Sequence, residues 1–457
     1  MLRLSDGQVE SLWDEALPGE VRELPKDLAA LDGLLQDPVL LQPISSHWRV
    51  EAISHGRPTI PMETYVRLMV VKQRTGWGYE TLVREVSDSL HLRRFCLIAL
   101  GERVPHESTV RKLTRRLGPD VVDELTRCVI AKAQRETRFK PRAGRIDSTV
   151  VEADVRYPSD AALSLDGART VAREARRLTG LIGADAPHVR DRSRALGRRL
   201  RAISRTVGRR TGERKAHVLR LTQQMGELLG QSVREARRVV LAARARARGR
   251  GAQRKLQAIA KLEELADRAE RVTAQIERRI AGEPIPDRLV SLFDPDARPI
   301  RKGKLGKPNE FGYVLQICEV TQNTRRGARG FILPPSTRPG NPPEIRLLPD
   351  TSRELERLGL RLREVALDGG FERRPSTEAL ARLAPERVFI AGRQQPGSRR
   401  TQRRLARYRT GAEGRISHLK RSYGLRRSRL KGQAGMKTWS AWSILAYNLD
   451  TLAIRTG

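Results

Sequence analysis

A β-branched segment interrupted by one acidic residue constrains the fold most strongly. Residues 142–158 read RAGRIDSTVVEADVRYP, and Ile146 and Val150 within it are typical of a strand that buries at least one face. Asp147 interrupts this strand, and a buried carboxylate is costly unless it is paired or binds a metal. The alternative is that Asp147 ends the strand and caps a turn with Ser148. The segment alone leaves both interpretations open.

Two later segments carry acidic residues in comparable positions. Residues 362–371, LREVALDGGF, form a short apolar run that ends in Asp368 and two glycines, which allow backbone or ligand to come close. A later segment with helical spacing places Arg409 one turn before Glu413 and Lys420 about two turns after it. Two strands and a helix thus each supply a carboxylate. Hard cations prefer such oxygen ligands, so we expect a site for divalent cations.

The order Asp147, Asp368, Glu413 resembles the DDE triad of bacterial insertion-sequence transposases. The spacing of Arg409, Glu413 and Lys420 matches the Arg-Glu-Lys part of the Tyr-Arg-Glu-Lys signature of that family. The resemblance also covers PMETYVRLMVVKQRTGWGYETLVREVSDSLHLRRFC and GLRRSRLKGQAGMKTWSAWSILAYNLDTLA, and it spans most of the chain apart from roughly residues 165–285.

One position of the signature departs from the family pattern. The family places its tyrosine two residues further upstream of the arginine, where this chain has Ala406, whereas Tyr408 directly precedes Arg409. The resemblance therefore assigns no DNA-end role to a tyrosine here.

The resemblance implies an RNase H-like fold, an α/β (α+β) arrangement whose mixed sheet makes the strands of Asp147 and Asp368 neighbours. It implies that Asp147, Asp368 and Glu413 bind Mg²⁺ or Mn²⁺, as two ions, and catalyse phosphodiester hydrolysis at element ends followed by strand transfer. Arg409 and Lys420 would hold DNA phosphates beside the site. The alternative is an i,i+4 ion pair between Arg409 and Glu413, with Lys420 uninvolved.

Two other functions stay open. The chain could be a metal-dependent nuclease without strand transfer, or a non-catalytic DNA-binding protein derived from a transposase, although the complete triad argues against the latter. Glu152, Asp154 and Asp294 are competing acidic residues near strand-like runs, but they lack a match to the family. We expect these three at the surface.

Composition indicates a polyanionic partner. Lys and Arg number 89 against 53 acidic residues among 457, a net charge of +36, which points to double-stranded DNA, bound as a homo-oligomer such as a dimer. No apolar run reaches about 18 residues, so we expect no membrane span and a cytoplasmic, nucleoid-associated protein. Cys96, Cys128 and Cys318 lack paired spacing, which supports neither a disulfide framework nor a zinc site.

Residues 1–135 are expected to form an N-terminal helical domain that binds DNA. Within it, Ser108 is a good N-cap for the helix TVRKLTRRLG, which resembles part of a helix-turn-helix unit. Its apolar residues, expected to face inward, are Val110, Leu113 and Leu117. Its basic residues, expected to be exposed and to contact DNA, are Arg111, Lys112, Arg115 and Arg116. The alternative is a basic helix that only packs.

Residues 165–285 are expected to form a helical insertion after the first strand. Residues 169–280 hold 30 Lys and Arg against 11 acidic residues, a net +19, and their apolar spacing predicts three or four long helices. A charge run is usually a solvated face, but its size here favours contact with phosphates. The catalytic domain is then expected at 136–164 and 286–457, with further strands at 288–293, 311–320, 330–333 and 387–391.

Overall fold

The computed structural model describes residues 17–47, 60–183, 185–206, 211–249, 251–304, 307–383, 385–394 and 397–456. It divides into two compact units, the first formed by Met1–Asp154 with Tyr313–Gly457 and the second by Val155–Gly312. Among the helices of these ranges, none is both long enough and apolar enough to cross a membrane.

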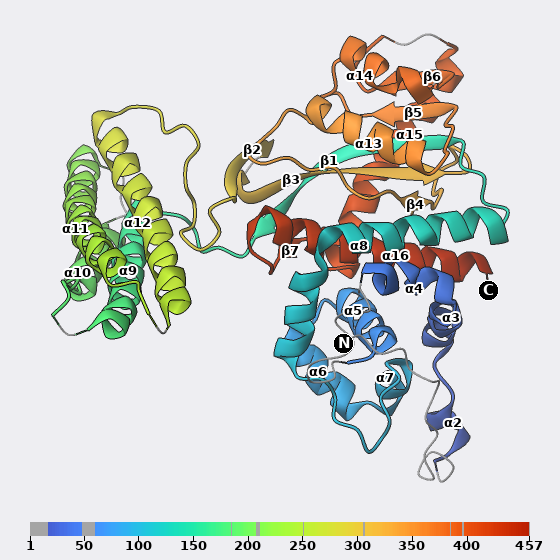
Figure 1. The fold of residues 1–457 in the computed structure, drawn as a ribbon. Helices are drawn as coiled ribbons and strands as arrows, with labels where there is room; N and C mark the ends of the chain where they lie inside the picture. The colour runs from blue at the N-terminus through green and yellow to red at the C-terminus, as the bar shows by residue number, and fades with distance from the viewer. Residues whose placement is uncertain are drawn as a thin grey trace. The chain divides into compact units, whose positions relative to one another are not determined.

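The first unit joins a sheet to many helices (Figure 1). Its strands are β1 (Ala143–Ala153), β3 (Lys307–Thr321), β4 (Phe331–Ile332), β5 (Glu364–Leu367), β6 (Arg387–Ile390) and β7 (Arg427–Ser428), of which β3 begins within the residues of the second unit. Its helices are α2 (Gly19–Arg22), α3 (Lys26–Leu35), α4 (Pro38–His47), α5 (Met62–Thr75), α6 (Tyr79–Asp88), α7 (Leu90–Phe95), α8 (Glu107–Glu136), η2 (Glu344–Leu347), α13 (Leu348–Arg357), α14 (Arg373–Leu380), η3 (Ala381–Leu383), α15 (Arg399–Ser422) and α16 (Gly432–Thr456).

Strand β1 is central to the sheet. The strand order is β2-β3-β1-β5-β6, with β4 beside β3 and β7 beside β1. β1 runs parallel to β5 and β5 parallel to β6, whereas β3 is antiparallel to β2 and β4. The fold is therefore mixed α/β and consistent with the expected RNase H-like arrangement. The expected neighbourhood of the first strand and the Asp368 strand is confirmed.

The two faces of the sheet are buried against different helices. On one face, Ala143 of β1 and Ala366 of β5 pack against Leu405 and Tyr408 of α15. On the other face, Ile146 of β1 belongs to a cluster of buried residues that includes apolar side chains of α13, α16 and the N-terminal helices. This second cluster is continuous, so the residues expected to form a separate domain, 1–135, share one core with the sheet.

Helix α5 is buried around almost its whole circumference, between α16 and other N-terminal helices. Arg67, Lys72 and Gln73 are each 1% exposed although their side chains are polar or charged. Tyr65 of α5 donates a hydrogen bond to Thr114 Oγ1 of α8 at 3.1 Å. The helix is thus a core element.

Helix α8 continues the helix expected before Gly118 beyond that residue, as far as Glu136. The backbone at Gly118 is non-helical, with φ of 69°, which glycine tolerates, so the helix is kinked there. The expected N-cap Ser108 is wrong by two residues: α8 begins at Glu107, and the His106 ring accepts the Ser108 N–H at 3.2 Å. Histidine supplies the acceptor that the first turn needs.

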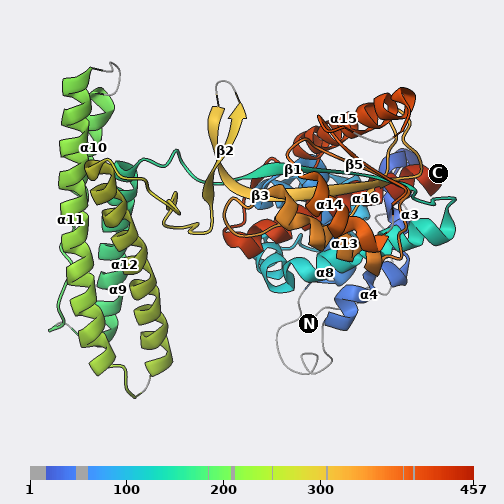
Figure 2. The same ribbon diagram turned by 90° about the horizontal axis from the view of Figure 1, so that it is seen from above.

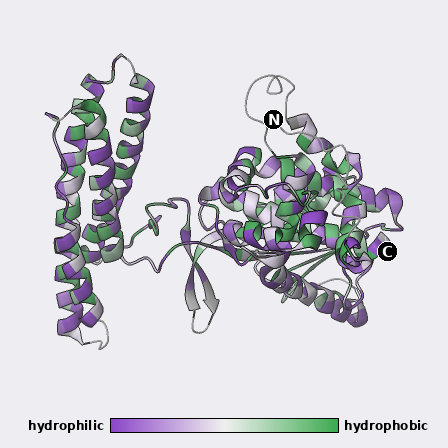
Figure 3. Ribbon diagram, turned by 90° about the horizontal axis from the view of Figure 1, so that it is seen from below, coloured by the Kyte–Doolittle hydropathy of each residue, from purple (hydrophilic) through white to green (hydrophobic). Residues whose placement is uncertain are grey.

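The second unit contains the helices α9 (Asp160–Ile182), α10 (Ser193–Thr206), α11 (Gly212–Ala245) and α12 (Ala252–Ala281), and the strand β2 (Arg298–Lys304) (Figure 2). Hydrophobic and hydrophilic residues alternate along these helices (Figure 3). Met225, Leu229 and Leu262 are fully buried between them. The expected insertion, 165–285, lies within this unit.

The strand expected at 288–293 is not a strand. Leu289 and Leu292 are buried in the core of the helical unit instead. The Leu289 backbone N–H donates to the Gln275 side chain of α12 at 2.5 Å, which satisfies it without a partner strand. The apolar residues of this run are therefore buried against helices and not in a sheet, and the strand after the helices is β2.

Candidate active site

Asp147 lies in the middle of β1 and is 8% exposed. Side chains alternate between the faces of a strand, so Asp147 lies on the same face as Arg145, which contacts α15. Its Oδ1 accepts the Ser148 N–H at 2.7 Å. Burial, together with the negative charges of Asp368 and Glu344, raises the pKa of Asp147 to about 6, against the opposing effects of the Ser148 N–H and Arg409.

Asp368 directly follows β5, at the position next to Asp147 in the sheet. The register pairs Ile146 with Leu367, so the next residues on the two strands are the two acids. The residues Gly369 and Gly370 then turn the chain away. The negative charge of Asp368 adds to the effect of burial in raising the pKa of Asp147. Asp147 and Asp368 are therefore neighbours in the sheet although they are far apart in the sequence.

Glu413 comes from α15, and Arg409 links it to Asp368. Arg409 Nη1 donates to Asp368 Oδ1 at 2.8 Å, and Nη2 donates to Glu413 Oε1 at 2.9 Å. The arginine side chain is 16% exposed, less than either carboxylate. The i,i+4 ion pair expected as an alternative is therefore present, and the same arginine also joins the helix to the end of β5.

A buried ion pair holds α15 against the sheet beside these acids. Arg145 of β1 donates to Glu319 of β3 at 2.8 Å and to the Tyr408 carbonyl of α15 at 3.2 Å, and its guanidinium lies 5.1 Å from the centre of the Tyr408 ring. Glu319 also accepts from Arg415 of α15 at 3.0 Å. A methyl group at Gly411 would overlap the Arg145 guanidinium, so glycine allows this close approach.

Sequence reasoning missed this ion-pair network. Glu319 is 1% exposed, and the signal that could have identified it was a single acid inside the apolar run FGYVLQICEV. A buried charge requires a partner, and Arg145 in the first strand was a candidate.

Tyr408 is a core residue. Its hydroxyl lies 2.6 Å from Thr321 Oγ1, and burial raises its pKa far above the usual value. Lys420 lies on the same helix and is half-buried.

The basic residues of α8 have two different environments. Lys112, Arg115 and Arg116 are exposed as expected, and Val110, Leu113 and Leu117 are buried as expected. Arg111 is not fully exposed, because it pairs with Glu107 and lies 5.6 Å from the centre of the Tyr79 ring. The i,i+4 spacing of glutamate and arginine explains this correction.

The competing acids lie elsewhere in the structure. Glu152 accepts from Arg427 Nη2 at 3.0 Å, and Asp154 is exposed. The expectation of a surface position is wrong for Asp294, which is 2% exposed. It follows Leu289 and Leu292, which are buried in the core of the helical unit, and its backbone N–H donates to Ser291 Oγ at 3.2 Å. Cys96, Cys128 and Cys318 are free thiols.

The three expected ligands fit a cation by their chemistry. Within the described ranges, no three His, Cys, Asp or Glu side chains are close enough together to hold a metal ion. Arg409 is placed between two of the three acids. Burial is the largest cause of the raised pKa of Asp147, and the negative charge of Asp368 adds to it. A divalent cation bound here would offset the negative charge of these carboxylates, which supply the oxygen ligands that hard cations prefer.

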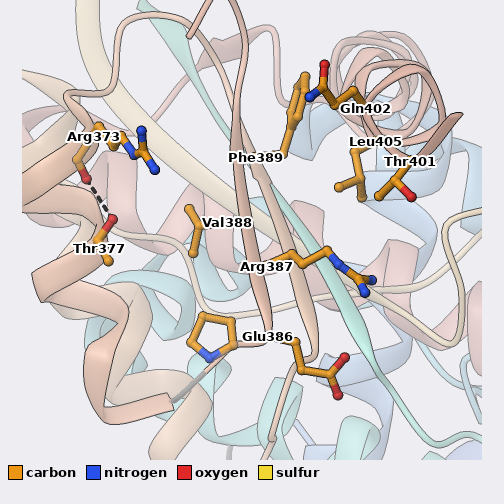
Figure 4. A pocket seen from close by; sticks show the side chains of 10 residues that line it. Arg373, Thr377, Glu386, Arg387, Val388, Phe389, Thr401, Gln402 and Leu405 are labelled. Carbon is orange, nitrogen blue, oxygen red and sulfur yellow. Dashed lines mark hydrogen bonds between the residues drawn. The ribbon is translucent and has the colours of Figure 1, made fainter. Parts of the chain in front are cut away.

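A separate hollow lies at the edge strand β6 (Figure 4). It is lined by side chains of α14, β6 and α15 and the segment before β6, namely Arg373, Thr377, Pro385, Glu386, Arg387, Val388, Phe389, Thr401, Gln402 and Leu405. None of the three acids lines it, so it is distinct from the candidate site.

A mixed sheet with acids at adjacent positions of two neighbouring strands is consistent with the RNase H-like class of enzymes that act on nucleic acids. Residues 21–116 match the family described as "Transposase domain (DUF772)", and residues 303–449 match the family described as "Transposase DDE domain". No curated protein and no solved structure matches the chain. The chain belongs to the DDE transposases, which act on DNA.

The two matched segments divide the candidate site. Asp368 and Glu413 lie inside the segment matched by the DDE domain, whereas Asp147 lies between the two matched segments. The assignment of Asp147 thus depends on its place beside Asp368 in the sheet. The helical unit lies between β1 and most of β3 in the sequence. Most of it also lies outside both matched segments.

Proposed function

We propose that this transposase cleaves phosphodiester bonds at the ends of an insertion sequence and joins those ends to target DNA, with Asp147, Asp368 and Glu413 as its catalytic acids. The observation that carries the proposal is the register of β1 and β5, which puts Asp147 and Asp368 side by side. Glu413 reaches the same place through Arg409, which contacts both Asp368 and Glu413.

The three carboxylates would hold Mg²⁺ or Mn²⁺, as two ions. When bound, such ions activate water or a 3′-hydroxyl and stabilise the leaving oxygen. Asp147 contributes only when it is ionised, and its raised pKa is lowered again when positive charge is placed beside it. Rigid placement on a central strand keeps this carboxylate in position.

Arg409 has two roles in the proposal. Without DNA it neutralises Asp368 and Glu413, which prevents the two carboxylates from repelling one another. With DNA and cations present, its planar guanidinium is free to hold a phosphate through two parallel hydrogen bonds. Lys420, on the same helix, contributes a second positive charge for the DNA backbone.

DNA binding away from the acids is assigned to two surfaces. The exposed Lys112, Arg115 and Arg116 of α8, with Arg111 beside them, lie in the segment matched by the first transposase family. An arginine of such a helix can read base edges, whereas the basic helical unit supplies contacts to phosphates that do not depend on sequence. A homo-oligomer, most simply a dimer, would bring two element ends together.

Replacing each acid by its amide tests the proposal. Asp147→Asn, Asp368→Asn and Glu413→Gln should each reduce cleavage of element-end DNA by at least 100-fold, on the order of the contribution of a catalytic group. Binding to the same DNA should change little, because a metal ligand and not a phosphate contact is lost. Cleavage is measured under single-turnover conditions, with Asp154→Asn as the control on the same segment. Full activity of Asp368→Asn would refute the assignment.

The same assay separates transposition from simple cleavage. A transposase joins the cleaved 3′ ends to a target duplex, which gives a product longer than either substrate. A nuclease without strand transfer gives cleaved ends alone.

A further inference from the structure

Tyr157 is the most exposed aromatic residue of the described ranges. It is 81% exposed, whereas the other six tyrosines of the chain are buried. It follows the end of β1 by four residues and belongs to the second unit. An aromatic side chain in this position forgoes the large favourable free energy that burial of its ring would give. Single exposed apolar residues are common on protein surfaces, so the surroundings of Tyr157 decide whether it has a function.

The ring and the backbone of Tyr157 are both held in place. The ring meets Phe311 of β3 edge to face, with the ring centres 5.7 Å apart and the planes at 89°. The Tyr157 carbonyl accepts from the Ser159 N–H at 3.1 Å, and the Pro158 carbonyl accepts from Arg288 at 3.1 Å. An edge-to-face contact covers at most one face of a ring, and the high exposure of Tyr157 leaves the other face open. The residue therefore presents a fixed, uncovered aromatic face.

Basic residues continue from Phe311 along the sheet. β2 and the first part of β3 pair as an antiparallel ribbon, in which Pro299 lies opposite Phe311 (Figure 2). Residues 298–307, RPIRKGKLGK, hold five Lys and Arg and no acid. Arg301 of this segment is exposed and lies opposite Asn309, two residues before Phe311. Proteins that bind single-stranded nucleic acid combine an open aromatic face with positive charge in this way.

We propose that Tyr157, supported by Phe311, stacks on an unpaired base of DNA while the basic β2–β3 ribbon contacts the adjoining phosphates. Bases inside a duplex are already stacked on one another, so an open ring finds a free base face in a single strand or at a strand end. Positive charge favours this partner over a second copy of the chain, which carries the same net charge of +36. The proposal goes beyond the proposed function, because it holds whether or not the three acids are catalytic.

Binding to strands with and without bases tests the proposal. Fluorescence anisotropy gives the affinity of the full chain for labelled oligo(dT) and for an abasic strand of the same length, which keeps the phosphates. Tyr157→Ala should reduce the preference for oligo(dT) by roughly 5- to 150-fold, as the loss of one base–aromatic stack does. Tyr157→Phe keeps the ring and should bind both strands as the unmodified chain does. Leu241→Ala, at a 67% exposed apolar residue of the same unit, is the matched control and should also leave the preference unchanged.

Other outcomes would overturn the proposal. If Tyr157→Ala keeps the preference for oligo(dT), or weakens binding to both strands equally, the ring does not stack on a base. If Tyr157→Ala changes only the sedimentation of the chain without DNA, the ring is a contact between copies. Tyr157→Leu keeps an apolar side chain without an aromatic face and should behave as Tyr157→Ala does, which guards against a loss of folding in one variant. Asp147→Asn should bind both strands normally, so a failure of the catalytic assignment is seen separately.

Discussion

Lys72 shows how far a single residue can depart from its usual environment. It is 1% exposed, and its ammonium lies 4.0 Å from the centre of the Trp439 ring and 4.8 Å from that of Tyr79. Burial, assisted by the positive charge of Arg429, lowers its pKa to about 7. The two aromatic faces attract the charged form and offset part of this cost. The residue therefore links the stability of the N-terminal helices to pH.

The sign of this pH dependence follows from the two pKa values. In the unfolded chain Lys72 keeps its proton up to about pH 10.5, whereas in the folded chain it loses it above about pH 7. Between these values the unfolded state binds more protons, so the free energy of unfolding rises with pH. Lys72→Met should thus stabilise the chain most at or below pH 7, with the gain declining towards pH 10. Each pKa unit corresponds to about 1.4 kcal/mol.

Denaturant unfolding at pH 7 and pH 10, followed by tryptophan fluorescence, measures this difference. Lys112→Met is the control, because Lys112 is exposed and should show the same small effect at both pH values. An effect of Lys72→Met that does not change with pH would contradict the lowered pKa.

At the scale of residues, the sequence predicts which acids lie on neighbouring strands better than it predicts their ion-pair partners. Asp147 and Asp368 were recognisable because each interrupts or ends an apolar run. The link from Arg409 to Asp368 was not recognisable, because it joins residues on different elements and depends on how α15 lies on the sheet.

At the scale of elements, the position of α15 depends on a single glycine. Gly411 lies two residues before Glu413 and faces the guanidinium of Arg145. Gly411→Ala raises helix propensity by up to about 1 kcal/mol, but it forces Arg145 away from a buried ion pair. Overpacking of this kind costs about 1–3 kcal/mol, so the net effect should be destabilising.

Gly414→Ala on the same helix is the matched comparison. No atom lies within 4 Å of a methyl group at that position, so helix propensity alone acts and the variant should be slightly more stable. Thermal unfolding compares the two, and cleavage rates should fall for Gly411→Ala because Glu413 moves with the helix. Equal stabilisation by both substitutions would show that Arg145 does not hold α15.

Elements with strong periodicity were predicted well. The segment whose helical spacing places Arg409, Glu413 and Lys420 together is α15, and the strand expected at 311–320 is β3. The strand expected at 288–293 failed because a short apolar run does not reveal whether sheet or helices will cover it. Tertiary packing against the helices determines how this run is buried.

At the scale of the whole molecule, some of the described basic side chains of the helical unit form ion pairs with acids and others do not. Four exposed arginines follow one side of α10 at spacings of four, three and four residues, and the structure of the described ranges gives them no ion pair. They are Arg194, Arg198, Arg201 and Arg205. Elsewhere in the same unit, Arg237 pairs with Asp267 and Glu270, and Arg244 pairs with Glu263. Counterion release therefore predicts that the α10 arginines contribute more to DNA affinity.

Changing all four α10 arginines to glutamine should reduce the salt dependence of DNA binding. The slope of log affinity against log salt should become shallower by up to about 3.6, since each phosphate contact contributes roughly 0.9. Arg237→Gln combined with Arg244→Gln is the control and should change the slope much less. Fluorescence anisotropy with non-specific duplex DNA at several salt concentrations measures both. An unchanged slope for the α10 variant would favour packing or dimerisation as the role of the helical unit.

The place of the helical unit in the chain also affects biosynthesis. β1 is the first strand to be made, yet its neighbours β3 and β5 begin about 150 and 210 residues later. At roughly 5–20 residues per second, the ribosome needs about 8–30 s to reach β3. The helices α9–α12 can form during this interval from local contacts, whereas both edges of β1 stay unpaired and can pair with other chains. A pause in translation after residue 153 would therefore increase the dependence of this protein on chaperones.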